Sequence, residues 1–222
     1  MVDGEAPSSL GVQFFPRMEY GRALALQESL LAAKIAGEPT DFLLLMEHDP
    51  VYTLGRGADE RDLLGAPERL GVPVFRVGRG GGATFHGPGQ LVGYPIVRLS
   101  PGCRDVHRYV RTLEEVLIHT CAEFGVTATV RPGLTGVWAG SEKIASIGIG
   151  VRRGVTYHGV ALNVFTDVAY FEHIVPCRVP WMPVTTLARL LGQAPSIAQV
   201  AAVFTRWFAA SLGYRELRGE AA

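Results

Sequence analysis

The sequence has little cysteine, little lysine and no long apolar run. Its three cysteines are odd in number and widely spaced along 222 residues, which does not fit a disulfide framework. Such cysteine usage is typical of a reducing compartment, so we expect a cytoplasmic protein. The longest purely apolar stretches are a few residues, far short of a membrane span, and Met1–Leu10 lacks the order of a signal peptide. We therefore expect no membrane contact, and a flexible segment over residues 1–10.

An excess of charge of either sign is also missing. Lysine and arginine number 21, as do aspartate and glutamate, so no global field favours a nucleic acid or an anionic membrane. The sequence contains no RRM, KH or helix-turn-helix pattern, which also disfavours a nucleic-acid binder. Neither CxxC, HxxxH nor HExxH occurs, so we expect no metal site. Walker A and Rossmann fingerprints are absent as well, and we expect no cofactor.

The periodicity of the chain predicts a single α+β domain over residues 1–222. A hydrophobic fraction of 48% with 19% charged residues is ordinary for a soluble globular enzyme. Strands and helices mix without regular βαβ alternation. Helices are expected at Arg17–Ala36, at Arg104–Phe124 with Gly125 after its end, and from Ser196 (with Gln199 in a capping box) to Gly213. Strands are expected at Phe42–Glu47, Val51–Leu54, Val74–Val77, Leu91–Leu99, Val126–Val130, Ile144–Val151 and Tyr157–Val164.

The run Arg79–Gln90 holds five glycines in twelve residues between two predicted strands. Glycine gives up much backbone freedom on folding, and the usual reason for keeping it is a positive φ or a close approach of the backbone to a ligand. We expect a loop in which Gly81 and Gly82 form an amide-lined wall while Arg79 and His86 face the same space. Glycines that alternate with apolar residues in Ile144–Val151 leave one strand face bare, which suits a ligand or another backbone packed against it.

The three cysteines differ in their surroundings. Cys121 lies on the apolar face of a predicted helix and is expected in the core, and nothing supports a role for Cys103. Cys177 lies in a segment stiffened by three prolines and precedes Arg178, which makes it a candidate thiolate nucleophile. A thiolate needs a base or a cation beside it. The six histidines are possible partners, as is Lys143, one of only two lysines, although a surface turn also explains Lys143.

Taken together, these motifs resemble the lipoate-protein ligase B family, the octanoyltransferases of lipoate biosynthesis. The segment Arg79–Gln90 matches the family signature RGGxxTxHxPGQ, which is long and specific. Further similar segments are Glu47–Gly55, Gly140–Gly148 around Lys143, Tyr157–Val164 (the HGxALNV strand) and Pro176-Cys177. One departure is Arg178, which stands where the family usually has glycine.

The resemblance implies a central mixed, largely antiparallel sheet flanked by helices, as in the catalytic domain of biotin and lipoate protein ligases. It implies transfer of an octanoyl group from octanoyl-acyl carrier protein to a lysine of lipoyl-accepting proteins, namely the lipoyl domains of 2-oxoacid dehydrogenase E2 subunits and the glycine cleavage H protein. Cys177 would carry the acyl group as a thioester, and Lys143 would lower the pKa of the thiol and move protons. The substrate-binding residues would be Arg79, Gly80, Gly81, Gly82, Ala83, Thr84, Phe85, His86, Ser146, Ile147, Gly148, Gly159, Val160 and Ala161.

Three other functions stay open. An ATP-dependent lipoate or biotin ligase shares the expected fold but needs no cysteine, and a non-catalytic module could hold an acyl group without transferring it. An amidotransferase between two lipoyl-bearing proteins would share the thioester chemistry. Arg152, Arg153 and Arg178 are candidate docking residues for an acidic carrier protein, because they lie near the proposed site in sequence.

Overall fold

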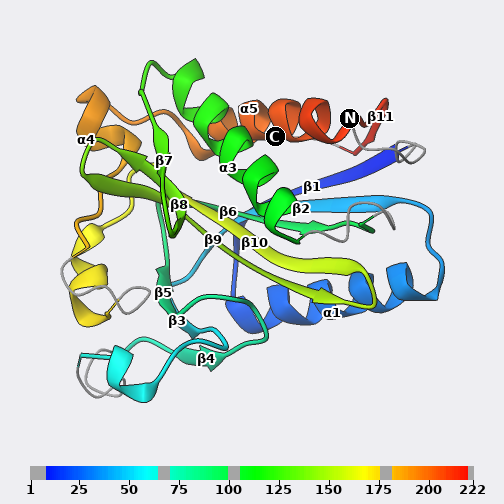
Figure 1. Ribbon diagram of the computed structural model, residues 1–222, viewed down its shortest axis with the longest axis horizontal. Helices are drawn as coiled ribbons and strands as arrows, with labels where there is room; N and C mark the ends of the chain where they lie inside the picture. Colours follow the sequence, from blue (N-terminus) through cyan, green and yellow to red (C-terminus); the bar gives the residue numbers. More distant parts are fainter. Residues whose placement is uncertain (1–8, 65–70, 100–105, 176–181, 220–222) are drawn as a thin grey trace.

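A computed structural model of the chain describes residues 9–64, 71–99, 106–175 and 182–219. Within these residues an eight-stranded sheet has the order β11-β1-β2-β6-β10-β9-β8-β7, and a three-stranded sheet has the order β4-β3-β5. In the large sheet β1 pairs in parallel with β2 and β11, and the other neighbours are antiparallel. The expected mixed, largely antiparallel sheet flanked by helices is therefore confirmed (Figure 1).

The strands of the large sheet are β1 (Ser9–Met18), β2 (Asp41–His48), β6 (Gln90–Ile96), β7 (Thr129–Arg131), β8 (Leu134–Ala139), β9 (Glu142–Arg152), β10 (Val155–Asn163) and β11 (Glu216–Arg218). Those of the small sheet are β3 (Val51–Leu54), β4 (Val74–Arg76) and β5 (Ala83–His86). The α-helices are α1 (Tyr20–Ala36), α3 (Val106–Glu123), α4 (Leu187–Leu191) and α5 (Ile197–Leu212), and two 3₁₀ helices span Glu60–Asp62 and Val168–His173.

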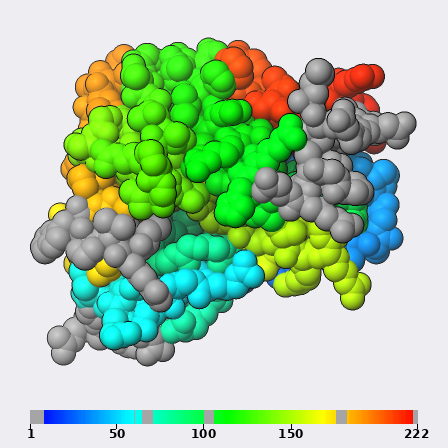
Figure 2. Space-filling model, viewed as in Figure 1, coloured from blue at the N-terminus to red at the C-terminus, as the bar shows by residue number. Residues whose placement is uncertain are grey.

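Helices cover both faces of the large sheet. The main core joins α3 and α5 to one face, and α1 packs a smaller apolar cluster against the other (Figure 1). The small sheet and the 3₁₀ helix Val168–His173 share a third cluster. In the space-filling view the cyan segments of the small sheet form a lobe beneath the green body that contains α3 (Figure 2). The strands β9 and β10 consequently lie between α1 and the main core.

The expected helix over Arg17–Ala36 begins later, at Tyr20. The Glu19 carboxylate accepts hydrogen bonds from the backbone N–H groups of Gly21 and Arg22 and so caps the first turn. The two residues before Glu19 belong to β1, which we did not expect from the sequence. Ser9 and Leu10 are buried in that strand, so the flexible segment expected over residues 1–10 is wrong at these two positions, and residues 1–8 lie outside the described chain.

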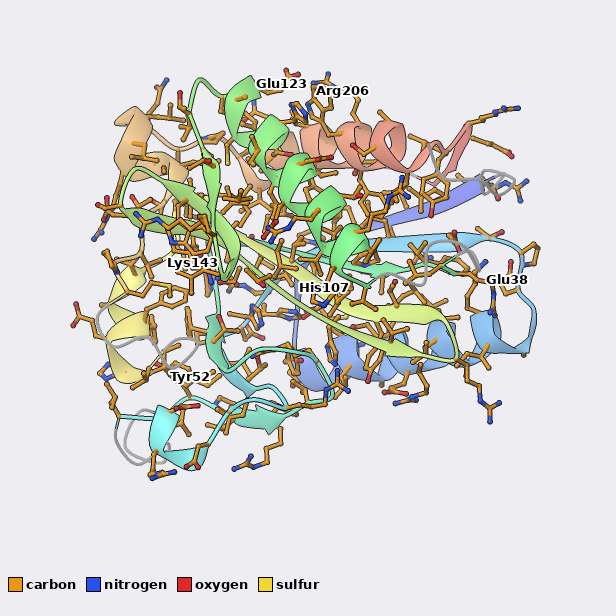
Figure 3. The ribbon with its side chains drawn as sticks, in the orientation of Figure 1. Glu38, Tyr52, His107, Glu123, Lys143 and Arg206 are labelled. Atoms are coloured by element: carbon orange, nitrogen blue, oxygen red, sulfur yellow. The ribbon has the colours of Figure 1, made fainter. Side chains whose placement is uncertain are left out.

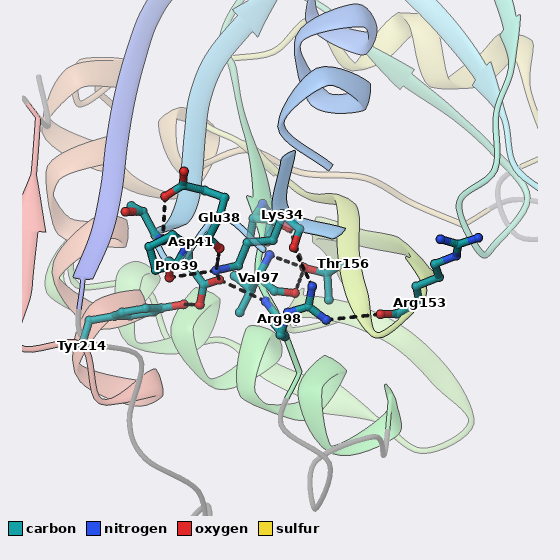
Figure 4. A network of polar contacts seen from close by, with 11 residues as sticks. Lys34, Glu38, Pro39, Asp41, Val97, Arg98, Arg153, Thr156 and Tyr214 are labelled. Carbon is teal, nitrogen blue, oxygen red and sulfur yellow. Dashed lines mark hydrogen bonds and ion pairs between the residues drawn. The ribbon is translucent and has the colours of Figure 1, made fainter. Parts of the chain in front are cut away.

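A buried ion pair ties the end of α1 to the sheet. Lys34 Nζ lies 2.8 Å from Asp41 Oδ1 and also donates to two carbonyl groups of the turn after the helix. The same carboxylate accepts from the Arg98 N–H and from the Tyr214 hydroxyl, which follows α5 (Figure 4). This network joins α1, β2, the end of β6 and the end of α5, and it accounts structurally for one of the two lysines.

Candidate active site

A pocket lies between β9, β10 and β6 of the large sheet, the small sheet and α1. Most of the residues expected to bind substrate line it: Arg79, Gly81, Gly82, Ala83, Thr84, His86, Ser146, Ile147, Gly148, Gly159, Val160 and Ala161. Its other lining residues are Tyr20, Val92, Tyr94, Lys143, His158, Asn163, Phe171 and Val184. The structure thus brings together segments that lie more than a hundred positions apart in sequence.

Lys143 is among the residues that line this pocket, and its place in the fold is labelled in Figure 3. It is 5% exposed, so the alternative of a surface turn lysine is wrong. The register between β8 and β9 shifts at this point, since Val137 pairs with Ala145 but Trp138 pairs with Lys143, which leaves one extra residue on β9. Such a bulge redirects the neighbouring side chain. Here the Lys143 ammonium group lies 5.2 Å from the centre of the Trp138 ring.

The lysine stem needs the glycine beside it. A Cβ placed on Gly136 would lie 2.7 Å from Lys143 Cε, and the φ of Gly136, +132°, is one that other residues rarely adopt. The Gly136 N–H donates to the buried carboxylate of Glu114, on α3. The strand opposite Lys143 is therefore held in place while leaving room for the side chain.

Cys177 lies outside the described residues, as do Cys103 and Arg178, but the structure describes the chain on both sides of Cys177. Before it, the Val175 N–H donates to the Asp62 carbonyl. After it, the Lys143 N–H donates to the Pro183 carbonyl and the Thr185 N–H donates to the Lys143 carbonyl. The segment that follows Cys177 is therefore attached to the backbone of Lys143.

Both flanks of that segment reach the pocket. Phe171, six residues before Cys177, and Val184, seven residues after it, are among the lining residues. By contrast, Cys121 is fully buried in the main core, as expected, and burial raises the pKa of its thiol to about 12. Cys121 is therefore a packing residue.

The glycine-rich run contains a turn followed by a strand. Residues 79–82 form the turn, with Gly81 at φ +82°, and the next four residues form β5, which we had expected to be loop. The Gly81 and Gly82 carbonyls accept hydrogen bonds from Gly57 and Gly55, which join the turn to the chain after β3. A Cβ on Gly55 would lie 2.4 Å from the Gly81 carbonyl oxygen, so the two glycine-containing segments can approach only without side chains.

Two residues of the run are not among the lining residues. Gly80 donates its N–H to the Ile149 carbonyl on β9, and the Phe85 ring stacks on Tyr170 and packs against Phe171. Arg79 does line the pocket and is buried, and its guanidinium donates to both the carbonyl and the hydroxyl of Thr53. Its position is therefore set by β3.

A chain of polar groups runs beneath the pocket floor. The amide nitrogen of Gln90 donates to Asn163 Oδ1, which leaves the Gln90 oxygen as the acceptor for His86 Nδ1 at 2.8 Å. His86 therefore carries its proton on Nδ1, and Nε2 is its free acceptor. Asn163 in turn donates to the Thr185 carbonyl, in the segment that holds Lys143. Asn163 lies in the HGxALNV motif, so the sequence contained a signal for this missed residue.

Three histidines of this region are neutral at neutral pH. The pKa of His48 and His158 is lowered to about 4 and that of His86 to about 3, chiefly by burial, and the positive charge of Arg79 contributes to the lowering for His86 and His158. The described lining residues include two cationic side chains, Lys143 and Arg79, and no carboxylate. The pocket thus offers an apolar wall with positive charge and no competing negative charge.

The bare glycine face of β9 and β10 is filled by protein. A Cβ on Gly148 would meet Arg79 Cδ and the Gly80 carbonyl at 3.0 Å, and one on Gly150 would meet the Tyr157 ring at 2.4 Å. On β10, a Cβ on Gly159 would lie 2.1 Å from a backbone carbonyl of β6. Close approach of other chain segments, which was one of the two expected reasons, accounts for these glycines.

Two of the three candidate docking arginines, Arg152 and Arg153, are not near Lys143. Arg152 and Arg153 lie at the turn between β9 and β10, nine residues from Lys143, which corresponds to ~30 Å along a strand. Arg152 is paired with Glu28 on α1. Nearness in sequence was therefore a wrong guide to nearness in space for these two residues.

A metal site is not formed by the described residues, since no group of three or more histidine, cysteine, aspartate or glutamate side chains among them could hold an ion. No helix in the described ranges is long and apolar enough to span a bilayer.

Residues 19–209 match the family model described as the lipoyl protein ligase A/B catalytic domain. The chain belongs to this family. Among curated relatives, proteins named octanoyltransferase are 50% identical over 83% of the chain and 84% of their own length in Geobacter metallireducens, and 45% identical over 97% of each in Rubrobacter xylanophilus. These relatives agree with the resemblance to the lipoate-protein ligase B branch of the family.

Solved structures agree in fold. A lipoate-protein ligase A bound with ATP superimposes with a TM-score of 0.77 at 20% identity, covering 96% of this chain and 90% of that one. A putative lipoate protein ligase from T. acidophilum with bound lipoic acid has a TM-score of 0.76 at the same identity and coverage. Biotin protein ligase from Aquifex aeolicus, with biotin and ATP, is more distant, at a TM-score of 0.57 and 10% identity.

Proposed function

We propose that this chain is an acyltransferase that moves an octanoyl group from a carrier-bound thioester to a lysine of a lipoyl-accepting protein, through an acyl thioester on Cys177. The relatives named octanoyltransferase, at 45–50% identity over most of the chain, support the overall activity. The observation that carries the mechanism is the buried Lys143, whose backbone is bonded to the segment following Cys177 and whose side chain lines an apolar pocket.

In the first half-reaction the proton of the Cys177 thiol is held by Lys143 as its ammonium, and the Cys177 thiolate attacks the carbonyl carbon of the donor thioester. A new C–S bond forms to Cys177, the donor C–S bond breaks, and the departing carrier thiolate takes the proton back from Lys143. General acid–base assistance of this kind contributes roughly 10²–10⁴-fold in rate. The exchange of one thioester for another needs no nucleotide or metal.

In the second half-reaction the ε-amine of the acceptor lysine attacks the acyl thioester. A C–N bond forms, the C–S bond to Cys177 breaks, and the proton lost by the amine returns to the cysteine through Lys143. The product amide is more stable than the thioester, so this step drives the transfer. The acceptors are the lipoyl domains of 2-oxoacid dehydrogenase E2 subunits and the glycine cleavage H protein, and the donor is octanoyl-acyl carrier protein.

The pocket supports binding of the acyl chain. Its wall along β9 and β10 contains Ile147, Val160 and Ala161, and no described carboxylate lines it. Burying about six methylene groups at roughly 0.8 kcal/mol each favours binding by about 5 kcal/mol. The pocket-lining members of the glycine-rich turn and of β5 form another part of the pocket wall.

Intact mass spectrometry tests the proposal directly. The purified protein is incubated with octanoyl-acyl carrier protein without ATP, beside the variants Cys177→Ser and Cys103→Ser. We expect an octanoyl mass gain, labile to hydroxylamine, in the wild type and in Cys103→Ser but not in Cys177→Ser. Acceptor modification only when ATP and free acid are supplied would instead establish an ATP-dependent ligase. An adduct that persists in Cys177→Ser would show that Cys177 is not the nucleophile.

The variant Lys143→Met tests whether Lys143 is the group that takes the proton of the Cys177 thiol. Lys143 donates its backbone N–H to the Pro183 carbonyl and accepts from the Thr185 N–H with its backbone carbonyl, so the substitution removes the amine and keeps the backbone attachment. We expect adduct formation to slow by about 10²–10⁴-fold at pH 7 and to recover partly at higher pH, where the thiol ionises unaided. A wild-type rate and pH profile would exclude Lys143 as the base.

A further inference from the structure

His158 is the most unusual residue of the pocket. It adopts φ +56° inside β10, a left-handed conformation that histidine tolerates better than most residues but rarely takes within a strand. The register places it level with Pro95 of β6, since Val160 pairs with Gly93 on one side and Val155 with Arg98 on the other. Proline offers no N–H to the ladder, so the two strands separate at this level.

The separated backbone is satisfied by α1 instead. The His158 N–H donates to Gln27 Oε1 at 3.0 Å, and Gln27 is fully buried. Two polar atoms of this pair, His158 Nδ1 and Gln27 Nε2, have no hydrogen-bond partner in the part of the chain that the structure describes. His158 is itself only 2% exposed and lines the pocket. A buried nitrogen without a partner is unfavourable, and it makes that end of the pocket less suited to an alkyl chain.

His158 lies at the end of the pocket away from Lys143. On β9 the lining residues run from Lys143 to Gly148, and His158 pairs with Ile149, one residue further. Six residue steps along β9 therefore separate the Lys143 level from the His158 level, or ~20 Å. An extended octanoyl chain spans ~9 Å and an extended hexadecanoyl chain ~19 Å at standard C–C bond lengths.

We propose that the imidazole of His158 is the end wall of the acyl-binding site and sets its upper limit of chain length. This inference rests on the proposed function. With the carbonyl at the Lys143 end, an octanoyl chain stops well before the ring, and a hexadecanoyl chain places its apolar terminus against His158 Nδ1. His158 is thus a specificity-determining residue, and it takes no part in proton transfer.

Competition between donors tests the end wall. Equimolar octanoyl and hexadecanoyl thioesters of coenzyme A are offered together, and the two acyl-enzyme masses are quantified at early times. His158→Gly removes the ring and suits the positive φ, and we expect it to raise the hexadecanoyl-to-octanoyl ratio at least tenfold over the wild type. His158→Asn, which also tolerates this backbone conformation, covers the case in which the glycine variant folds poorly, and should raise the ratio by a smaller factor.

Arg153→Gly is the matched control. Arg153 has nearly the same backbone conformation, φ +50°, but lies at the turn between β9 and β10 and does not line the pocket, so its ratio should equal that of the wild type. An unchanged ratio in folded His158→Gly and His158→Asn, or an equal rise in Arg153→Gly, would overturn the end wall.

Equilibrium binding separates this inference from the proposed function. Titration calorimetry with free octanoate and free hexadecanoate needs no acyl transfer. If the wild type forms no acyl-enzyme but His158→Gly still gains at least tenfold in hexadecanoate relative to octanoate affinity, the proposed function fails and the end wall stands. If the relative affinity does not change, or neither acid binds, the end wall is wrong.

Discussion

Acid should unfold this protein because three histidines are buried in their neutral form. An unfolded histidine titrates near pH 6.5, whereas burial lowers the pKa of His48 and His158 to about 4 and that of His86 to about 3. Between these values the unfolded chain binds protons that the folded chain does not bind, so the free energy of unfolding falls as the pH falls. The stability is complete above about pH 6.5 and is lost progressively down to the folded-state values.

The size of the effect follows from the displacement of the pKa values. Between pH 7 and pH 5 the protonation of each histidine in the unfolded chain lowers the free energy of unfolding by about 2 kcal/mol, because one pKa unit corresponds to ~1.4 kcal/mol. The three together remove about 5–6 kcal/mol, which is a large part of the ~5–15 kcal/mol that stabilises an ordinary domain. We therefore expect the protein to become marginal or to unfold near pH 5.

Urea unfolding at pH 7, 6 and 5 measures this dependence. His48 bonds to the Met18 carbonyl through Nδ1 and, as acceptor, to the Tyr94 hydroxyl through Nε2, so His48→Gln keeps a neutral donor and acceptor but cannot titrate. The free energy of unfolding of this variant should be lower than that of the wild type at pH 7. Between pH 7 and pH 5 it should fall by about 2 kcal/mol less than that of the wild type. His119→Gln, on the exposed face of α3, should keep the wild-type dependence. Equal pH dependence in His48→Gln and the wild type would refute the reasoning.

Substitutions at two further places test the packing of the fold. Lys34→Met should destabilise the fold by about 3–5 kcal/mol, because it leaves the buried Asp41 carboxylate without its cation, and adding Asp41→Asn should restore part of the loss in thermal unfolding. An unchanged melting temperature in Lys34→Met alone would contradict a stabilising role of the buried pair. Gly159→Ala should also lower the melting temperature, since its Cβ would lie 2.1 Å from the Gly93 carbonyl oxygen. Gly80→Ala should lower it less, because the nearest atom to its Cβ, the Ile149 carbonyl oxygen, is 3.5 Å away. Equal melting temperatures for the two alanine variants would show that the sheet adjusts.

Helix ends were predictable because short segments encode them. The capping box of Ser196 and Gln199 forms as expected, and Gly213 ends α5 in the left-handed conformation. Gly125 likewise follows α3 with φ +81°. Each of these features depends on hydrogen bonds between residues a few positions apart, so local sequence suffices to specify them.

Edge and parallel strands were harder to predict. β1 pairs in parallel with β2 and β11, and nothing adjacent in the chain indicates either partner. Likewise β5 follows the glycine turn directly and becomes a strand only because β3 lies beside it. Strand formation depends on non-local partners, which periodicity cannot identify.

By itself the sequence determined the family, through the long glycine-rich signature, and the kinds of groups available for chemistry: a cysteine among prolines, two lysines and no metal-binding motif. Tertiary structure decided how those groups are used. It buries Lys34 against Asp41 and places Lys143 in the pocket, and it turns His158 out of the β6 ladder opposite Pro95. The physical reason is that the environment of each side chain comes from strands and helices far away in sequence, and pairing them is a property of the whole fold.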